Sequence, residues 1–137
     1  MSFVHLHNHS HYSILTALAK PQQYVQIAKN QGSSALALTD SGVMYGALEF
    51  YKAAKAAGIK PILGVEMYVA PLGMAIKTPE NRYSSLVLLA RNNVGYHNLL
   101  KLSTLAALEG FYYKPRIDDE VLAQHAEGLI ALSGSLN

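Results

Sequence analysis

The sequence contains no cysteine and has few charged residues. Without cysteine, neither a disulfide scaffold nor a thiolate metal site can form, and a reducing cytoplasm is compatible with the chain. No apolar stretch reaches the roughly 18 residues that a membrane span needs, and the N-terminus lacks the basic region and apolar run of a signal peptide. These absences predict a soluble, cytoplasmic chain with no membrane partner.

Charged residues make up only 15% of the 137 residues, whereas 50% are hydrophobic. A typical globular domain has about 25% charged residues, so this composition excludes both disorder and a coiled coil. The net charge is +2, and the basic residues are scattered, with Lys114 and Arg116 the nearest to a cluster. We therefore predict no dedicated nucleic-acid patch. Such a low charge content predicts that much of the surface is covered by a partner or by the rest of a larger domain.

The hydrophobic pattern predicts strands and helices in alternation. Strands are expected at residues 3–7, 35–39, 61–69, 86–90 and 129–132. Helices are expected from Pro21 to Gly32, over residues 45–57, from a cap at Asn93 to Gly110, and over residues 118–125. The alternation predicts an α/β domain with a parallel sheet. Because the sequence stops directly after the last predicted strand, we expect residues 1–137 to be part of a larger domain.

The strongest local signal is a set of alternating histidines: His5, His7, His9 and His11. On a strand, the first three would point to one face, with neighbours about 6.5–7 Å apart. Neutral imidazole binds Zn, Mn, Fe or Ni, so the segment predicts a metal or phosphate site. The alternative is a strand with a solvated face. His97 and His125 fall in predicted helices and are expected to be ordinary surface or boundary residues.

Two carboxylates are candidates to complete such a site. Asp40 directly follows a predicted strand, and Glu66 lies within the next one. Ligands of parallel α/β folds bind outside the carboxyl ends of the strands, where His7, His9 and Asp40 are expected. An aspartate before Ser-Gly also occurs in turns and helix caps, so that alternative stays open for Asp40. Glu66 interrupts an apolar segment, and a buried carboxylate is costly without a partner, so we expect a metal or a cation beside it.

The motifs, taken in order, resemble the PHP (polymerase and histidinol phosphatase) domain family. Within that family they are most similar to the branch found at the N-terminus of bacterial DNA polymerase III alpha subunits. The matching stretches are residues 3–10, 36–40, 43–51, 58–66, 86–90, 95–96, 98–102 and 110–118. The resemblance implies a distorted (β/α) barrel of the PHP type, of which residues 1–137 form only the N-terminal portion. It also implies that they are a fragment of a larger polymerase chain.

The resemblance further implies a set of metal ligands. His7 and His9 match the paired histidine ligands, Glu66 matches the acidic ligand, Asp40 matches the aspartate of the Thr-Asp motif, and His5 is placed as an outer member. The implied cofactor is a divalent ion, Zn or Mn, with Mg expected for the polymerase part outside this sequence. In active members, metal-bound hydroxide attacks a phosphorus ester while adjacent metals neutralise the developing charge. No catalytic residue is assigned beyond these ligands.

Four departures from the family pattern affect this site. Thr16 replaces the usual aspartate of Leu-Asp-Gly, Ser41 and Ser85 replace usual histidines, and Ser135 replaces a usual cysteine. Hydroxyls are poor ligands for Zn or Mn at neutral pH. The changes therefore predict a degenerate metal site.

Three functions are compatible with the sequence. The leading hypothesis is the N-terminal PHP part of a replicative DNA polymerase III alpha subunit, a DNA-directed DNA polymerase of DNA replication, serving mainly as a structural and subunit-binding module. The alternatives are an active metal-dependent phosphoesterase or proofreading 3′–5′ exonuclease in the same polypeptide, and a stand-alone PHP phosphatase. The expected partners are the rest of the polymerase chain, the proofreading exonuclease subunit by resemblance, and DNA through the full-length protein.

Overall fold

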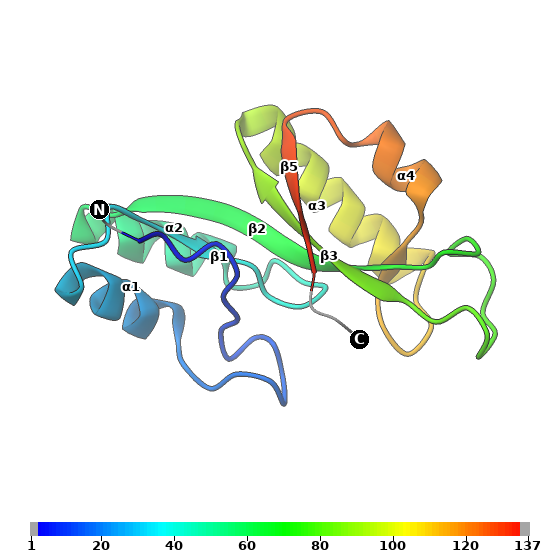
Figure 1. Ribbon diagram of the computed structural model, residues 1–137, viewed down its shortest axis with the longest axis horizontal. Coiled ribbons are helices and arrows are strands. Elements are labelled where there is room, and N and C mark those ends of the chain that lie inside the picture. The colour runs from blue at the N-terminus through cyan, green and yellow to red at the C-terminus, as the bar shows by residue number, and fades with distance from the viewer. Residues whose placement is uncertain (1–2, 135–137) are drawn as a thin grey trace.

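Figure 1 shows the computed structural model, which describes residues 3–134. The strands are β1 (Ala35–Leu38), β2 (Lys60–Val69), β3 (Ser84–Ala90), β4 (Arg116–Ile117) and β5 (Leu129–Ser133). The helices are α1 (Pro21–Asn30), α2 (Ala47–Ala57), α3 (Asn93–Leu108) and α4 (Asp119–Gln124). All except the short β4 were predicted from the hydrophobic pattern, with boundaries shifted by one or two residues in most cases.

The strands form one mixed sheet in the order β1-β2-β3-β5, and β4 pairs with β2 beyond this path. β2 is parallel to β1 and β4, whereas β3 is antiparallel to both β2 and β5. The prediction of a parallel sheet is therefore wrong at β3. Parallel neighbours need a crossover, usually a helix, and the connection between β2 and β3 contains no helix. The chain consequently returns directly alongside β2.

The histidine segment is extended but is not a strand, so the prediction of a strand at residues 3–7 is wrong. The segment runs beside β1, where Ala37 N donates to His5 O at 3.0 Å and Thr39 N donates to Asn8 O at 2.9 Å. The side-chain amide of Asn8 also donates to Ala37 O at 3.0 Å and to His5 O at 3.2 Å. These hydrogen bonds from the Asn8 side chain take the place of the regular backbone hydrogen bonds that a strand would form with β1.

Three apolar clusters form the core of the described residues, and β2 contributes to all of them. The two larger clusters lie toward opposite ends of β2, the long central strand in Figure 1. In one cluster, α1 and α2 pack on β1 and the start of β2 around the fully buried Phe50. In the other, α3 packs on β2, β3 and β4 through Leu99 and Leu102. Because side chains alternate along a strand, the burial of Val65 and Met67 against α3 directs Glu66 to the opposite face.

The helix ends show one further correction. The side chain of Asn92 accepts a hydrogen bond from Gly95 N at 3.0 Å, so Asn92 caps α3 and the prediction of Asn93 as the cap is wrong by one residue. Asp118 caps α4 in the same way through Val121 N at 3.0 Å. No helix in residues 3–134 combines the length and the apolar character required to span a bilayer.

Candidate metal centre

The fold brings together three of the side chains that the sequence singles out. His7 Nε2 lies 3.2 Å from His9 Nε2 and 3.5 Å from Glu66 Oε2, and His9 Nε2 lies 2.7 Å from the same carboxylate oxygen. These residues form a group that could hold a metal ion, with their ligand atoms within 4.8 Å of one another. The two histidines come from the extended N-terminal segment and the glutamate comes from β2.

The donor set fits a single small divalent ion. Ligands of a tetrahedral zinc ion, each about 2.0–2.1 Å from the metal, lie about 3.3 Å from one another. Two edges of the triangle, 3.2 Å and 3.5 Å, match that spacing, whereas the 2.7 Å edge between His9 and Glu66 is a hydrogen-bond distance that would open slightly on binding. Three protein ligands leave a fourth position open, so the group offers one three-ligand site.

The backbone around Asn8 positions the two histidines. Asn8 N donates to Thr39 Oγ1 at 2.9 Å, and the Thr39 hydroxyl donates to Asn8 O at 3.1 Å. Asn8 is thereby tied to the end of β1, and the residues on either side of it, His7 and His9, point to Glu66 on β2. Sequence reasoning missed this positioning role of Asn8 and Thr39. The only sequence signal for this role is the Thr39-Asp40 pair directly after a buried strand.

Glu66 is a buried carboxylate with several partners. Burial raises the pKa of Glu66, but the hydrogen bond from Ser85 and the charges of His9 and His7 outweigh it, and the pKa is lowered from its ordinary 4.5. The Ser41 hydroxyl also donates to Glu66 Oε2 at 3.3 Å. Ser41 and Ser85, which stand where the resemblance implies histidines, therefore both hydrogen-bond this carboxylate.

Asp40 lies in a different environment, in which hydroxyl and amide donors surround it. Its two carboxylate oxygens accept hydrogen bonds from Ser10 N at 2.6 Å, Ser10 Oγ at 2.8 Å and Ser13 Oγ at 2.7 Å. His5 is exposed, and its ring packs edge-to-face on Phe3 at 4.7 Å. Among residues 3–134, the group of side chains close enough to share an ion includes neither Asp40 nor His5.

The remaining histidines lie outside this group. His97 and His125 each use ring Nδ1 to hydrogen-bond a carbonyl oxygen one turn earlier, Asn93 O at 2.8 Å and Val121 O at 2.9 Å. His97 is exposed and His125 is half-buried, as the sequence predicts for surface and boundary residues. The His11 ring stacks at a tilt on Tyr12, with ring centroids 4.2 Å apart.

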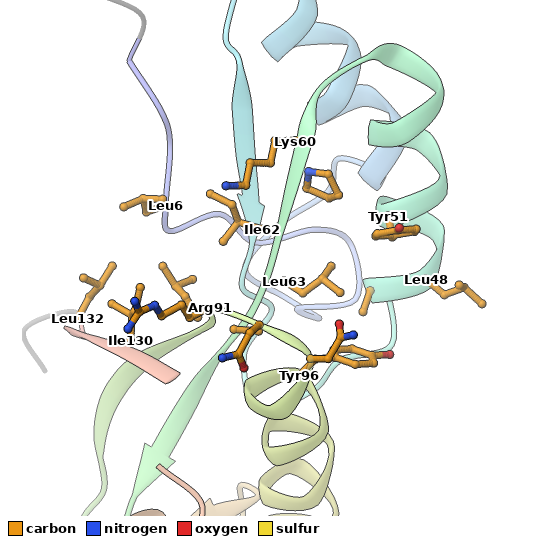
Figure 2. A pocket seen from close by; sticks show the side chains of 16 residues that line it. Leu6, Leu48, Tyr51, Lys60, Ile62, Leu63, Arg91, Tyr96, Ile130 and Leu132 are labelled. Atoms are coloured by element: carbon orange, nitrogen blue, oxygen red, sulfur yellow. The ribbon is translucent and has the colours of Figure 1, made fainter. Parts of the chain in front are cut away.

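A separate hollow of about 650 Å³ lies beside the start of β2 (Figure 2). Its side chains come from the N-terminal segment, β2, β3, α2, α3 and β5, and those labelled in the figure include Leu6, Tyr51, Ile62, Tyr96, Ile130 and Leu132. None of the three candidate metal ligands lines it. The candidate chemistry and the apolar hollow are therefore different features of the molecule.

The sequence model of the PHP domain matches residues 5–137. The chain belongs to the PHP domain family. It is 55% identical over 139 residues to the DNA polymerase III subunit alpha of Treponema pallidum, a match that covers 99% of this chain and 12% of that protein. The alpha subunit of Thermus aquaticus is 48% identical, with 99% and 12% covered, and that of Borreliella burgdorferi is 47% identical, with 98% and 12% covered. This PHP chain thus spans about one eighth of the length of these relatives.

Two solved structures have a similar fold. A Bifidobacterium adolescentis protein that carries the name of a metal-dependent phosphoesterase matches with a TM-score of 0.51 at 16% identity. An amidohydrolase from Chromobacterium violaceum, solved with sulfate and without metal, matches with a TM-score of 0.51 at 21% identity. Each match covers 75% of this chain and 32% of the other. The likeness concerns the fold, and it confirms the predicted PHP-type α/β architecture.

Proposed function

We propose that this PHP domain is the N-terminal part of a bacterial replicative DNA polymerase III alpha subunit, a DNA-directed DNA polymerase of DNA replication. The observation that carries the proposal is the match to alpha subunits across nearly the whole chain, at identities from 44% to 55%. Residues 1–137 are then part of a PHP domain in a larger polypeptide. Nucleotidyl transfer, with its Mg, belongs to other regions of that polypeptide.

Within the polymerase, we propose that the domain is mainly a structural and subunit-binding module with a degenerate metal site. A bridged metal pair needs more ligands than two histidines and one glutamate. Ser41 and Ser85 offer Glu66 hydroxyls, which are poor ligands for Zn or Mn. The close contacts of His9 and His7 to Glu66 also join the N-terminal segment to β2, which is a structural role that needs no ion.

A second candidate is an active phosphoesterase or 3′–5′ exonuclease. Three protein ligands with an open fourth position are the pattern of catalytic rather than structural zinc sites, and this observation favours it. A divalent ion such as Zn or Mn supplies Lewis-acid polarisation of a phosphoryl oxygen when bound. His7, His9 and Glu66 would hold that ion. Asp40, as the aspartate of the Thr-Asp motif, and His5, as an outer member, remain proposed metal ligands.

The two candidates are separated by experiments on the full-length polypeptide. Nucleotide incorporation, release of nucleotides from a 3′ end and bound Zn and Mn are measured for the wild type and for a His7→Ala/His9→Ala variant. We expect both proteins to incorporate nucleotides equally and neither to show 3′–5′ release of its own. Absence of incorporation by the wild type would overturn the polymerase proposal. Loss of both bound metal and 3′–5′ release in the variant would establish the exonuclease instead.

We further propose that the loop after the histidine segment contributes to binding the proofreading exonuclease subunit. Ile14, Leu15 and Leu18 in this loop are 79%, 100% and 95% exposed, and such clustered apolar exposure is typical of interaction sites. Substitution Leu18→Ser is expected to weaken co-elution of the full-length polypeptide with that subunit on size exclusion. Leu108→Ser, at a leucine that is 77% exposed at the end of α3, is the matched control. Equal co-elution of the two variants would contradict this placement.

A further inference from the structure

Two connections bring tyrosines and cations together at one end of the sheet. They are the segment between β2 and β3 and the segment between α3 and β4, which lie at the same end of the molecule (Figure 1). Between them is a pocket of about 240 Å³, whose lining includes Arg82, Tyr83, Tyr112, Tyr113 and Arg116. Sequence reasoning predicted no such patch, because these residues come from two stretches about 30 positions apart.

The tyrosine rings pack edge-to-face in two pairs. Tyr68 and Tyr83 have ring centroids 4.7 Å apart, and Tyr112 and Tyr113 have centroids 4.6 Å apart. Tyr113 is the most exposed of the four, with 81% of its surface accessible. Its ring therefore offers an aromatic face to solvent, at the rim of a pocket with other aromatic walls.

The backbone holds Tyr113 in an unusual conformation. Its φ is 59°, and the tight turn around it is closed by Tyr112 N donating to Lys114 O at 3.1 Å. Left-handed backbone is uncommon for a bulky residue, and such positions cluster at binding and active sites. The turn presents the large ring outward where a glycine would fit with less strain.

Basic residues outnumber acidic ones around the pocket. Segments 77–83 and 111–116 contain four basic residues, Lys77, Arg82, Lys114 and Arg116, and one carboxylate, Glu80. Lys114 Nζ lies 5.6 Å from the centroid of the Tyr68 ring, within cation–π range. Positive charge and aromatic rings are thus interleaved on this surface.

The same surface adjoins the candidate metal centre. Tyr68 follows Glu66 by two residues on β2, so both side chains lie on one face of the strand. Ser85, the ladder partner of Tyr68, hydrogen-bonds Glu66. A linear polymer bound along the tyrosines can therefore reach His7 and His9, because the tyrosines and the histidines lie on the same side of the sheet.

We propose that this surface binds single-stranded nucleic acid, with one base stacked on Tyr113 and the flanking phosphates paired with Arg82 and Lys114. Aromatic faces interleaved with cations along a groove are what sequence-independent single-strand binding requires. An acidic peptide would use the cations but would leave the exposed ring without a partner. The inference goes beyond the proposed function, and it rests on that function only in taking the strand to be DNA.

The test uses the full-length polypeptide and an oligothymidylate that carries 5-iodouracil. Irradiation forms crosslinks, and mass spectrometry assigns them to peptides, so binding here is distinguished from binding elsewhere in the protein. We expect crosslinks at both Tyr83 and Tyr113. Substitution Tyr113→Ala should raise the half-saturating oligonucleotide concentration for the Tyr83 crosslink by between about fivefold and about 150-fold, the range for loss of one stacked base.

Conservative and matched variants make the result interpretable. Tyr113→Phe keeps the ring and should retain the wild-type concentration dependence of the Tyr83 crosslink. Arg82→Ala should weaken crosslinking and reduce its dependence on salt, because one phosphate contact is removed. Tyr51→Ala on α2 and Arg91→Ala after β3 alter an exposed tyrosine and an exposed arginine away from this surface, and should have no effect.

The outcomes separate this inference from the proposed function. Nucleotide incorporation without any crosslink at Tyr83 or Tyr113 would overturn the inference and leave the polymerase proposal intact. A crosslink here in a protein that incorporates no nucleotides would do the reverse. If Arg82→Ala weakens crosslinking at Tyr83 and Tyr113→Ala does not, base stacking is refuted and the surface acts through charge alone.

Discussion

Two buried charged residues, Asp40 and Arg116, are stabilised by hydrogen bonds to uncharged groups. Asp40 accepts hydrogen bonds from hydroxyl and amide groups of Ser10 and Ser13. Arg116, which is 1% exposed, donates to backbone carbonyl oxygens and stacks on Tyr112. A buried charge without such bonds is expensive, so both residues are expected to organise the loops that supply their partners.

Replacing Asp40 with alanine is expected to loosen the loop that contains Ser10 and Ser13. The change leaves a buried amide and two hydroxyls without their acceptor, which costs about 2 kcal/mol or more. If this cost lowers the free energy of local opening, amide hydrogens of the loop exchange about thirtyfold faster. Hydrogen exchange of residues 10–19 in the full-length polypeptide measures the effect. Asp119→Ala removes an exposed carboxylate and serves as the control. Unchanged protection would mean that Asp40 does not support the loop.

Replacing Arg116 with lysine is expected to release the connection between β2 and β3. The guanidinium donates to Asn81 O at 3.2 Å and to Met74 O and Ile76 O, each at 3.3 Å. A lysine ammonium is a point donor that cannot span these carbonyls. Tryptic cleavage after the exposed Lys77 should accelerate in the variant. The exposed Arg91→Lys is the control, and equal cleavage rates would contradict the anchoring role.

At the scale of elements, the position of α3 depends on a close backbone approach. An added Cβ at Gly95 would lie 1.9 Å from Gly128 O in the turn before β5. The same turn is bonded to α3 through Asn98 Nδ2 and Glu127 O at 2.9 Å. The first turn of the helix therefore fits against this turn only when residue 95 has no side chain.

Substitution Gly95→Ala is expected to displace α3 from the turn and to destabilise this part of the domain by more than about 2 kcal/mol, the scale of an overpacked core position. Faster hydrogen exchange in residues 93–108 of the full-length polypeptide reports the change. Val94→Ala, at an exposed neighbour in the same turn of α3, should cost less than about 0.5 kcal/mol. Similar exchange in the two variants would refute the close-approach argument.

At the scale of the whole molecule, one edge of the sheet and the adjoining hollow are apolar and open. Within residues 3–134, β5 pairs only with β3, and Ile130 is 46% exposed. The hollow of about 650 Å³ beside it is lined by further aliphatic and aromatic side chains (Figure 2). An uncovered edge strand next to apolar surface is a template for pairing with another chain.

Residues 1–137 expressed alone are therefore expected to self-associate. Light scattering on size-exclusion fractions at several concentrations measures the mass. Charged substitutions Ile130→Lys and Leu132→Lys on β5 should shift the protein toward the monomer, because lysine on an edge strand opposes pairing. Tyr113→Lys, exposed elsewhere, is the control. A concentration-independent monomer for the unaltered sequence would contradict the expectation.

Most elements could be predicted from the sequence because their signals are local. Pro21 and Gly58 mark the start of α1 and the end of α2, and the apolar runs at β1 and β3 have the length of buried strands. Strand direction and register are not local. The antiparallel β3 follows from a connection without a helix, and the two-residue β4 forms only because β2 is there to pair with it.

The same distinction between local and tertiary information applies to the candidate site. The sequence by itself determined the PHP family resemblance and the residue types of the centre, because the histidine motif and the glutamate within an apolar segment are readable in one dimension. Only the tertiary structure decided that His7, His9 and Glu66 converge while Asp40 is surrounded by serine donors, and that two distant loops form one aromatic and cationic surface. Distances between side chains depend on how strands pair and loops fold back, and these are properties of the packed chain.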